Sequence, residues 1–253
     1  MKLSGNTILI TGGSAGIGLA FANKLVELGN EVIVTGRNKD KLDAVAKANP
    51  KLTAICSDAA DPKAISDLAR RMKDEFPKLN VLMNNAGIMI YRNLGMEDDL
   101  ASLTSEVDVN LSGPIRMTSA LIAQLKINKG TIINVSSALA FVPLHAAPIY
   151  CAAKAAMHSY TIALRQQLHD HGVEVIELMP PAVKTELASL PAEVKTMTTD
   201  ELVELTIKAL GKGKLEIRPG QANQLRFMSR WAPDFINGQL AKTSKGMIPK
   251  QPH

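Results

Sequence analysis

The sequence predicts an α/β fold built on one doubly wound, mostly parallel sheet with helices on both faces. The first observation is a regular alternation of short, β-branched apolar runs with longer helical stretches. Short runs that are almost wholly apolar are typical of strands buried on both faces of a parallel sheet. The second observation is a glycine-rich turn between the first run and the first helical stretch, where such folds bind nucleotides.

The elements follow one another in the order that this fold requires. A strand is expected at Thr7–Thr11, followed by a helix that runs to about Gly29. Further strands are expected from their β-branched residues at Glu31–Thr35, Leu52–Ser57, Val81–Met83, Thr131–Ser136, Glu174–Leu178 and Leu215–Ile217. Helical stretches lie between them, among which Lys39–Lys47 and Pro62–Phe76 follow the second and third strands.

Length and composition limit the classes of function. With 253 residues, 46% hydrophobic and 21% charged, the chain is expected to form a single domain over residues 1–253. No apolar run approaches a membrane span, and the first strand starts too close to Met1 for a signal peptide, so a cytoplasmic location is expected. The net charge of +5 comes from scattered Lys and Arg, which argues against nucleic acid as a partner. Cys56 and Cys151 lie far apart and predict neither a disulfide framework nor a metal site.

The glycine-rich turn predicts a nucleotide-binding site. The segment Thr11-Gly12-Gly13-Ser14-Ala15-Gly16-Ile17-Gly18 directly follows the first strand and opens the first helix. We expect Gly12 to permit the tight turn, Gly16 to let the backbone approach a pyrophosphate, and Gly18 to let helix and strand pack closely. The helix N-terminus supplies free N–H donors and the positive end of the helix dipole. Taken alone, such a turn has an alternative to nucleotide binding, which is that it merely connects a strand to a helix.

The end of the second strand favours NADP(H) over NAD(H). Enzymes that use NAD usually carry an acid there, about 20 residues after the glycines, which binds the ribose 2′-hydroxyl. This chain has Gly36 and Arg37 instead. Gly36 offers no carboxylate to repel a 2′-phosphate, and the planar guanidinium of Arg37 matches phosphate. The alternative is that Arg37 is a solvated surface charge and that cofactor choice is relaxed.

Tyr150, Lys154 and Ser137 are the candidate catalytic residues. Tyr150 and Lys154 are four residues apart and share one helix face, which places the ammonium near the phenol. Because a phenol has an ordinary pKa of about 10, we expect Lys154 and an oxidised nicotinamide to lower the pKa of Tyr150. Ser137, at a strand end, can hydrogen-bond the reacting oxygen. Taken singly, each has a structural alternative: Tyr150 as a core residue, Lys154 as a solvated helix charge and Ser137 as a helix or turn cap.

Together these motifs resemble the short-chain dehydrogenase/reductase family over nearly the whole chain. The resemblance rests on the glycine-rich turn, Asn84-Asn85-Ala86-Gly87, Asn110, Ser137 and Tyr150-x-x-x-Lys154. It implies a catalytic tetrad of Asn110, Ser137, Tyr150 and Lys154, in which Asn110, on a central helix, holds a water that links Lys154 to solvent. It also implies a cofactor site formed by Gly12, Ser14, Ala15, Gly16, Ile17, Gly18, Arg37, Asp58, Ala59, Asn85, Ala86, Gly87, Tyr150, Lys154, Pro180, Val183 and Thr185.

The chain departs from the family pattern after the sixth strand. The family usually has Pro-Gly there, whereas this chain has Pro180-Pro181. Because Pro181 fixes φ near −65°, we expect the loop beside the nicotinamide to be stiffer or slightly displaced. The Pro-Pro variant and the segments around Tyr150 and Glu216 resemble the DltE-like subgroup of the family, a resemblance that says little about substrate.

The leading functional hypothesis is an NADPH-dependent reductase of a small-molecule ketone or aldehyde, reversible toward alcohol oxidation. One alternative is an NADP(H)-binding sensor or scaffold without turnover. Another is an epimerase or dehydratase that retains its cofactor.

Three expectations concern the periphery of the fold. The segment at 187–199 is expected to form a mobile lid over the site. The tail from Lys242 to His253 is polar and basic and is expected to fray. Apolar residues on the helices expected at Leu100–Leu125 and Ala152–His169 predict a symmetric helix-on-helix contact, and hence a homodimer or homotetramer.

Overall fold

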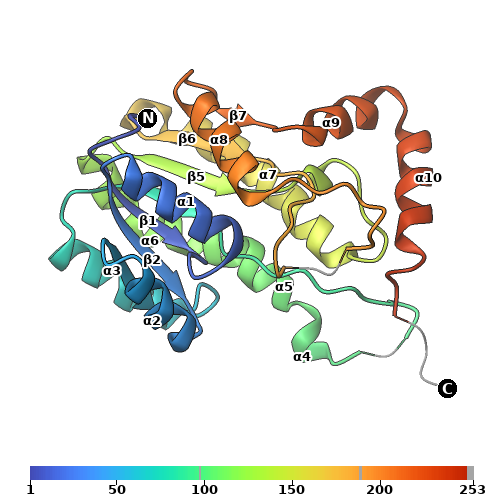
Figure 1. The fold of residues 1–253 in the computed structure, drawn as a ribbon, viewed down its shortest axis with the longest axis horizontal. Coiled ribbons are helices and arrows are strands. Elements are labelled where there is room, and N and C mark those ends of the chain that lie inside the picture. Colours follow the sequence, from blue (N-terminus) through green and yellow to red (C-terminus); the bar gives the residue numbers. More distant parts are fainter. Residues whose placement is uncertain (97, 188–189, 250–253) are drawn as a thin grey trace.

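The computed structural model describes residues 1–96, 98–187 and 190–249 (Figure 1). Within these residues the strands form one seven-stranded sheet in the order β3-β2-β1-β4-β5-β6-β7, and every neighbouring pair is parallel. The strands are β1 Thr7–Thr11, β2 Glu31–Gly36, β3 Leu52–Cys56, β4 Leu79–Asn84, β5 Thr131–Val135, β6 Glu174–Leu178 and β7 Glu216–Ile217. The predicted doubly wound fold is confirmed. The strand order reverses between β1 and β4, so their carboxyl ends form the crevice in which this fold binds ligands.

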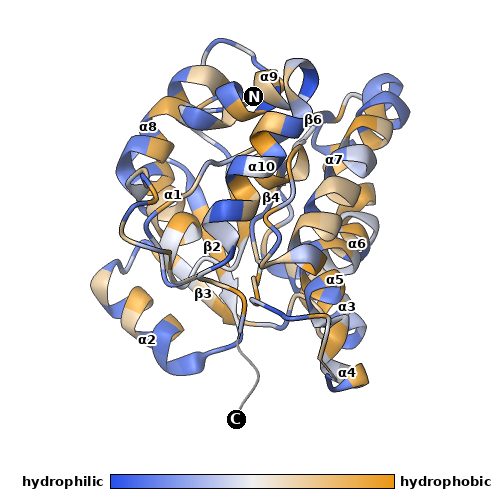
Figure 2. Ribbon diagram, turned by 90° about the vertical axis from the view of Figure 1, so that its right-hand side faces the viewer, coloured by the Kyte–Doolittle hydropathy of each residue, from blue (hydrophilic) through white to orange (hydrophobic). Residues whose placement is uncertain are grey.

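Helices cover both faces of the sheet (Figure 2). One layer consists of α1 Gly16–Glu27, α2 Lys39–Ala48 and α8 Thr199–Leu210, and the other of α3 Pro62–Glu75, α6 Gly113–Ile127 and α7 Pro148–Leu168. The two-residue period of the strands divides the core accordingly. Ile8 and Ile10 pack toward the first layer, whereas Leu9, between them, packs toward the second.

The helix expected at Leu100–Leu125 is broken in the structure. It divides into α4 Leu100–Leu103, α5 Ser105–Val107, the π-helical turn η1 Asp108–Ser112 and then α6. Pro114 explains the irregular turn, because it has no amide to donate to the carbonyl of Asn110 in a regular α-helix. Gly113 allows the helix to pass close to the loop after β3, since a Cβ there would lie 2.2 Å from the carbonyl oxygen of Ala59.

The prediction of a fraying tail is wrong for residues 242–249, while residues 250–253 lie outside the described chain. Two helices, α9 Gln221–Trp231 and α10 Pro233–Ser244, form the C-terminal part, and α10 stands beside the carboxyl edge of the sheet (Figure 1). The Ser244 Oγ accepts a hydrogen bond from the amide of His145 at 3.0 Å. Met247 is 9% exposed and packs in one apolar cluster with Tyr150. Burial of these side chains outweighs the polar composition of the tail.

The segment expected to form a lid joins β6 to α8 and lines the cavity described below. Its far end is anchored, because the amide of Met197 donates to Ala182 and the amide of Lys184 donates to Met197, each at 2.9 Å. Residues 188–189 lie outside the described chain, and the mobility of the segment stays a prediction. No helix in the described residues is long and apolar enough to cross a membrane.

Candidate active site

The glycine-rich turn forms a cradle at the carboxyl end of β1. Gly12 and Gly16 adopt φ of +66° and +53°, a left-handed conformation that favours glycine. The turn is tied to the segment after β4, because the hydroxyl of Thr11 accepts hydrogen bonds from the amides of Asn85 and Ala86, each at 3.0 Å. The side-chain amide of Asn85 donates in turn to the carbonyls of Thr11 and Gly12, at 2.9 and 3.1 Å. Asn85 therefore holds the shape of the cradle.

Gly18 lies behind the cradle and has no room for a side chain. A Cβ there would lie 2.4 Å from the carbonyl oxygen of Gly12 and 2.5 Å from the Nδ2 atom of Asn85. Both neighbours are fixed by the hydrogen bonds between Asn85 and the turn. This matches the role that the sequence assigned to Gly18, which is close packing of helix on strand.

We predict that Gly18→Ala lowers NADPH affinity by at least about tenfold, because the added methyl displaces the cradle, and lowers the free energy of unfolding by about 1–3 kcal/mol. Gly238→Ala is the matched control, since Gly238 lies within α10 and a Cβ there would meet nothing within 4 Å. The control should leave stability unchanged or raise it slightly. Fluorescence titration measures the NADPH affinity, and thermal unfolding measures the stability. Equal behaviour of the two variants would contradict the role of Gly18 in close packing.

Two adjoining cavities follow the cradle along the carboxyl edge of the sheet. The larger has a volume of about 1440 Å³ and the smaller about 560 Å³. The larger exceeds the roughly 300–1,000 Å³ of an ordinary ligand pocket, so it has room for a cofactor and a substrate. Among the predicted residues it is lined by Gly12, Ala15, Gly16, Ile17, Arg37, Asn85, Ala86, Gly87, Ser137, Tyr150, Lys154, Pro180, Val183 and Thr185. Ser14, Asp58 and Ala59 line the smaller cavity, together with Gly12, Arg37, Ala86 and Gly87.

Gly18 and Asn110 are the predicted site residues that line neither cavity. The left-handed glycines, the N-terminus of α1 at the cradle and the two cavities that share Gly12 and Arg37 fit a dinucleotide. Among the described residues, no group of three or more His, Cys, Asp or Glu side chains could hold a metal ion.

Two cations stand where the second strand ends. Arg37 is exposed and lines both cavities. Lys41, which the sequence analysis did not single out, lines the larger cavity and forms an ion pair with Glu186 at 2.6 Å. This pair joins α2 to the loop after β6. Lys41 lies in the first turn of α2, directly after the strand end that carries Arg37, and a second cation so close in sequence is the signal that would have identified it.

The three candidate catalytic side chains meet at one buried corner of the larger cavity. Tyr150 and Lys154 lie on α7, and Ser137 follows β5; none of the three is more than 7% exposed. Ser137 lies close enough to Tyr150 for its hydroxyl to act on the pKa of the phenol. The Nζ atom of Lys154 donates to the carbonyl of Val135 at 2.9 Å and lies 5.6 Å from the centre of the Tyr150 ring.

The expected lowering of the Tyr150 pKa is not found in the protein without cofactor. Burial raises the pKa of Tyr150 to about 12, against a smaller opposite effect of the Ser137 hydroxyl. Burial also lowers the pKa of Lys154 to about 8, while the nearby carboxylate of Glu177 acts to raise it. Desolvation disfavours the charged form of each group, so it exceeds the attraction that the sequence spacing suggested.

Asn110 lies in the π-helical turn and is fully buried. Its side-chain amide donates to the carbonyl of Ile88 at 2.8 Å, and its side-chain oxygen accepts from the amide of Ile88 at 3.1 Å. Both polar groups of the side chain are thus occupied by one backbone segment beside the cavity. A Cβ on Gly87 would lie 2.9 Å from the side-chain oxygen of Asn110 and 3.7 Å from the Nζ of Lys154, which shows how tightly these residues are packed.

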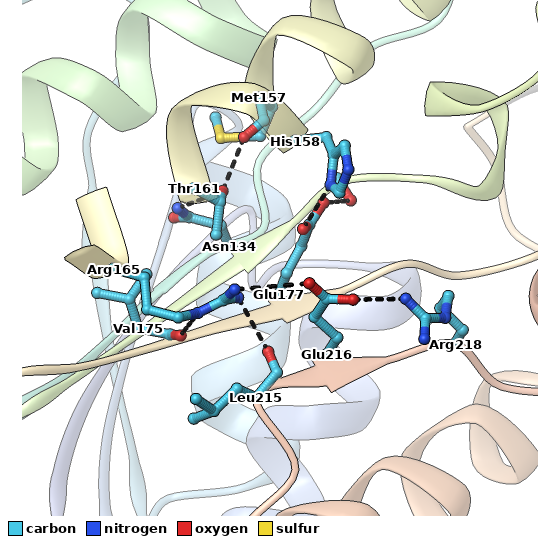
Figure 3. A network of polar contacts seen from close by, with 11 residues as sticks. Asn134, Met157, His158, Thr161, Arg165, Val175, Glu177, Leu215, Glu216 and Arg218 are labelled. Carbon is cyan, nitrogen blue, oxygen red and sulfur yellow. Dashed lines mark hydrogen bonds and ion pairs between the residues drawn. The ribbon is translucent and has the colours of Figure 1, made fainter. Parts of the chain in front are cut away.

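A polar network around the buried Glu177 was not predicted (Figure 3). Glu177 on β6 is fully buried, and its two oxygens contact the Ser136 hydroxyl at 2.5 Å and the Nδ1 atom of His158 at 2.8 Å. His158 follows Lys154 by four residues on α7 and is partly exposed. The signal that would have revealed the network is an acidic residue in the middle of an apolar parallel strand, where charges need a partner.

Comparisons with known proteins agree with this geometry. A family model described as short chain dehydrogenase matches residues 6–194. The chain is 40% identical over 248 residues to a Bacillus subtilis protein named uncharacterized oxidoreductase DltE, which covers 95% of this chain and 98% of the relative.

Two solved structures extend the comparison to the cofactor. A short chain dehydrogenase from Burkholderia cenocepacia in complex with NADP superposes with a TM-score of 0.84 at 26% identity, covering 95% of this chain and 99% of that one. A 3-ketoacyl-(acyl-carrier-protein) reductase from Brucella melitensis complexed with NADH superposes with a TM-score of 0.76 at 26% identity, covering 82% and 91%. A nicotinamide cofactor is common to both neighbours.

Proposed function

Because the chain belongs to the short-chain dehydrogenase/reductase family, we propose that it is an NADPH-dependent oxidoreductase that reduces a ketone or aldehyde and, in reverse, oxidises a secondary alcohol. The observation that carries the proposal is that Ser137, Tyr150 and Lys154 are all buried in the wall of the cavity that the glycine-rich cradle also lines. A phenol, a hydroxyl and an ammonium in one buried corner suit acid–base chemistry on an oxygen atom.

In the reduction direction Tyr150 is the proton donor. Its pKa of about 12 keeps the phenol protonated at neutral pH, so it holds the proton that the alcohol product requires. Ser137 hydrogen-bonds the substrate oxygen and keeps it beside the phenol. NADP(H), when bound, supplies or accepts the hydride. The ammonium of Lys154 then stabilises the phenolate that is left after proton transfer.

Asn110 has a positioning role in this proposal. Its side chain is occupied by the backbone of Ile88, so it fixes the loop that follows Gly87 along the cavity. The backbone carbonyl of Asn110 has no α-helical amide donor, because the residue four positions later is Pro114. A water that links Lys154 to solvent would therefore bind the carbonyl of Asn110 and leave the side-chain contacts intact.

Glu177 provides the nearby negative charge that favours the ammonium form of Lys154, and we predict a pH effect from its removal. Glu177→Gln removes the negative charge that acts against burial and raises the pKa of Lys154. The pKa of Lys154 therefore falls below about 8, and the ammonium loses its proton at lower pH. The high-pH decline of kcat/KM for carbonyl reduction should therefore move to lower pH, by about one unit. Glu216→Gln is the matched control, because Glu216 pairs with Arg165 and Arg218 at 3.5 and 2.5 Å. An unshifted profile in Glu177→Gln would contradict the role.

The proposed preference for NADP(H) rests on Arg37. Its guanidinium lines both cavities at the end of β2, and the residue before it is glycine, so no carboxylate opposes a 2′-phosphate there. Lys41 adds a second positive charge at the same mouth. The NADP complex of the Burkholderia cenocepacia neighbour is consistent with this preference, while the NADH complex shows that the fold itself allows either cofactor.

Association into a homodimer or homotetramer is part of the proposal. Ile115 on α6 and Ile162 on α7 are 38% and 47% exposed, on the two helices from which the sequence predicts a symmetric contact. The cytoplasmic location and the single-domain organisation stay predictions.

The test of the proposed function is a titration with NADPH and with NADH, followed by turnover. Nicotinamide fluorescence should show tighter binding of NADPH, and absorbance at the nicotinamide band should decay with a panel of ketones, aldehydes and quinones. Binding without turnover across the panel would favour a sensor or scaffold. A nucleotide that stays bound through purification, with conversion but no net NADPH consumption, would favour an epimerase or dehydratase.

A further inference from the structure

The larger cavity continues beyond Tyr150 into a chamber that the cofactor residues do not line. Its walls come from the loop between β5 and α7, the segment after β6, and α10 with the turn that follows it. The wall side chains that pack in one cluster with Tyr150 are Leu139, Leu144, Leu190, Val194, Leu240 and Met247. The phenol therefore lies at the inner end of an apolar space.

One wall of the chamber is α10, which crosses the carboxyl edge of the sheet (Figure 2). Ile236, Leu240 and Thr243 line the cavity and recur at the three- and four-residue spacing of one helix face, and Met247 continues that line in the turn after the helix. A helix of 12 residues is about 18 Å long. The wall thus follows the length of α10 and the turn after it, where an extended chain has room to lie.

The chamber offers no buried partner to a charged substrate. Beyond the cofactor positions and the Lys41–Glu186 pair at the mouth, the charged residues in the described part of its wall are Glu193, Lys195 and Lys242, and all three are exposed. The buried ions nearby, Arg92 and Glu106, do not line the cavity, and they lie 3.7 Å from each other. A carboxylate or ammonium carried into the chamber would lose its hydration without gaining a buried partner.

The chamber also lacks an aromatic platform. Among the described cavity residues the only aromatic side chains are those of Tyr150 and Phe235. The remaining apolar wall is branched aliphatic or thioether, and methionine adapts its shape to flexible ligands. These side chains suit an aliphatic chain better than a flat ring.

We infer that the enzyme acts on uncharged aldehydes or ketones with an extended aliphatic chain, the carbonyl meeting Tyr150 and Ser137 and the chain lying along α10. This inference deepens the proposed function and rests on it, since the chain is placed by a carbonyl that Tyr150 protonates. The hydride adds to the carbonyl carbon, the Tyr150 proton adds to the oxygen, and the product is the alcohol with the chain unchanged.

The test is a series of straight-chain aldehydes and 2-ketones, from butanal and 2-butanone to decanal and 2-decanone, with succinic semialdehyde as a charged comparison. Each buried CH₂ should raise kcat/KM by about fourfold, so decanal should exceed butanal by on the order of a thousandfold. Succinic semialdehyde should be a poor substrate. A flat series, or a preference for the charged aldehyde, would overturn the inference and leave the proposed function standing.

Leu240→Asn tests the wall itself. It should lower the decanal-to-butanal ratio of kcat/KM by about tenfold or more, and this ratio is independent of how much of the variant is folded. Leu205→Asn is the matched control, because Leu205 lies on α8, is 45% exposed and does not line the cavity. The control should keep the ratio of the native protein, and an unchanged ratio in Leu240→Asn would overturn the inference.

A binding measurement separates the chamber from the chemistry. Aliphatic amides from butanamide to decanamide mimic the carbonyl but are not reduced, and in the presence of NADPH they should raise the melting temperature more with each added CH₂. Length-dependent binding without turnover of any carbonyl would keep the chamber assignment and reject the proposed reaction. Turnover without length-dependent binding would keep the proposed reaction and reject the chamber assignment.

Discussion

Tyr150→Phe is expected to lower kcat/KM for carbonyl reduction by about 10²–10⁴-fold, while NADPH affinity stays within about twofold of the native protein. The substitution removes one hydroxyl and keeps the ring in its apolar cluster, so the cavity wall is preserved. The lost group is the only proton donor that the proposal assigns to the substrate oxygen. Steady-state turnover and nicotinamide fluorescence measure the two quantities on the same preparation.

The matched control for this prediction is Tyr160→Phe. Tyr160 lies on the same helix, almost three turns further on, where its hydroxyl is close to Thr118. Removal of the Tyr160 hydroxyl should change the free energy of unfolding slightly and turnover little. If Tyr150→Phe kept full activity on a substrate of the native protein, Tyr150 would not be the proton donor, whatever the control showed.

The elements that the sequence analysis found are those in which local pattern and tertiary structure agree. The strands Thr7–Thr11 and Glu174–Leu178 have the predicted bounds, because nearly all of their residues are buried and most are β-branched or apolar. The positions after strand ends were also found, since a parallel sheet brings the carboxyl ends of its strands to one edge. Ser137 and the glycine-rich turn belong to this group.

The features that the sequence analysis missed depend on contacts between distant segments. The end of α10 and the buried Met247 fall in the segment Lys242–His253 that was expected to fray, because its apolar residues are few and Met247 is buried in a cluster with residues distant in sequence, such as Leu144. The broken helix before α6 follows from Pro114 and from the close approach of Gly113 to Ala59. The direction of the Tyr150 pKa was misjudged because helix spacing indicates which charges are near and not how deeply the phenol is buried.

In the candidate site, Glu177 is another feature that depends on contacts between segments distant in the sequence. Its neighbours Ser136 and His158 lie 41 and 19 residues away in the sequence, so no spacing rule connects them. A fully buried carboxylate needs partners, and the fold provides them. The positions of residues that follow a motif can therefore be predicted, whereas the groups that act on their charge state emerge only from the packed structure.

Arg37→Glu is expected to reverse the cofactor preference. Loss of a charge-assisted hydrogen bond to the 2′-phosphate costs about 1.5–3 kcal/mol, and the new carboxylate repels that phosphate, so NADPH affinity should fall by about 100-fold or more. NADH affinity should stay equal or rise, because a carboxylate at this strand end can accept a hydrogen bond from the ribose hydroxyl.

Lys39→Glu provides the matched control for Arg37→Glu. It makes the same change of charge two residues further along, on an exposed side chain that lines neither cavity. Fluorescence titrations at two salt concentrations separate the local contact from the general field, because screening weakens the effect of Lys39→Glu and leaves most of the effect of Arg37→Glu. Equal losses of NADPH affinity in the two variants would mean that net charge at the mouth, and not the guanidinium of Arg37, sets the preference.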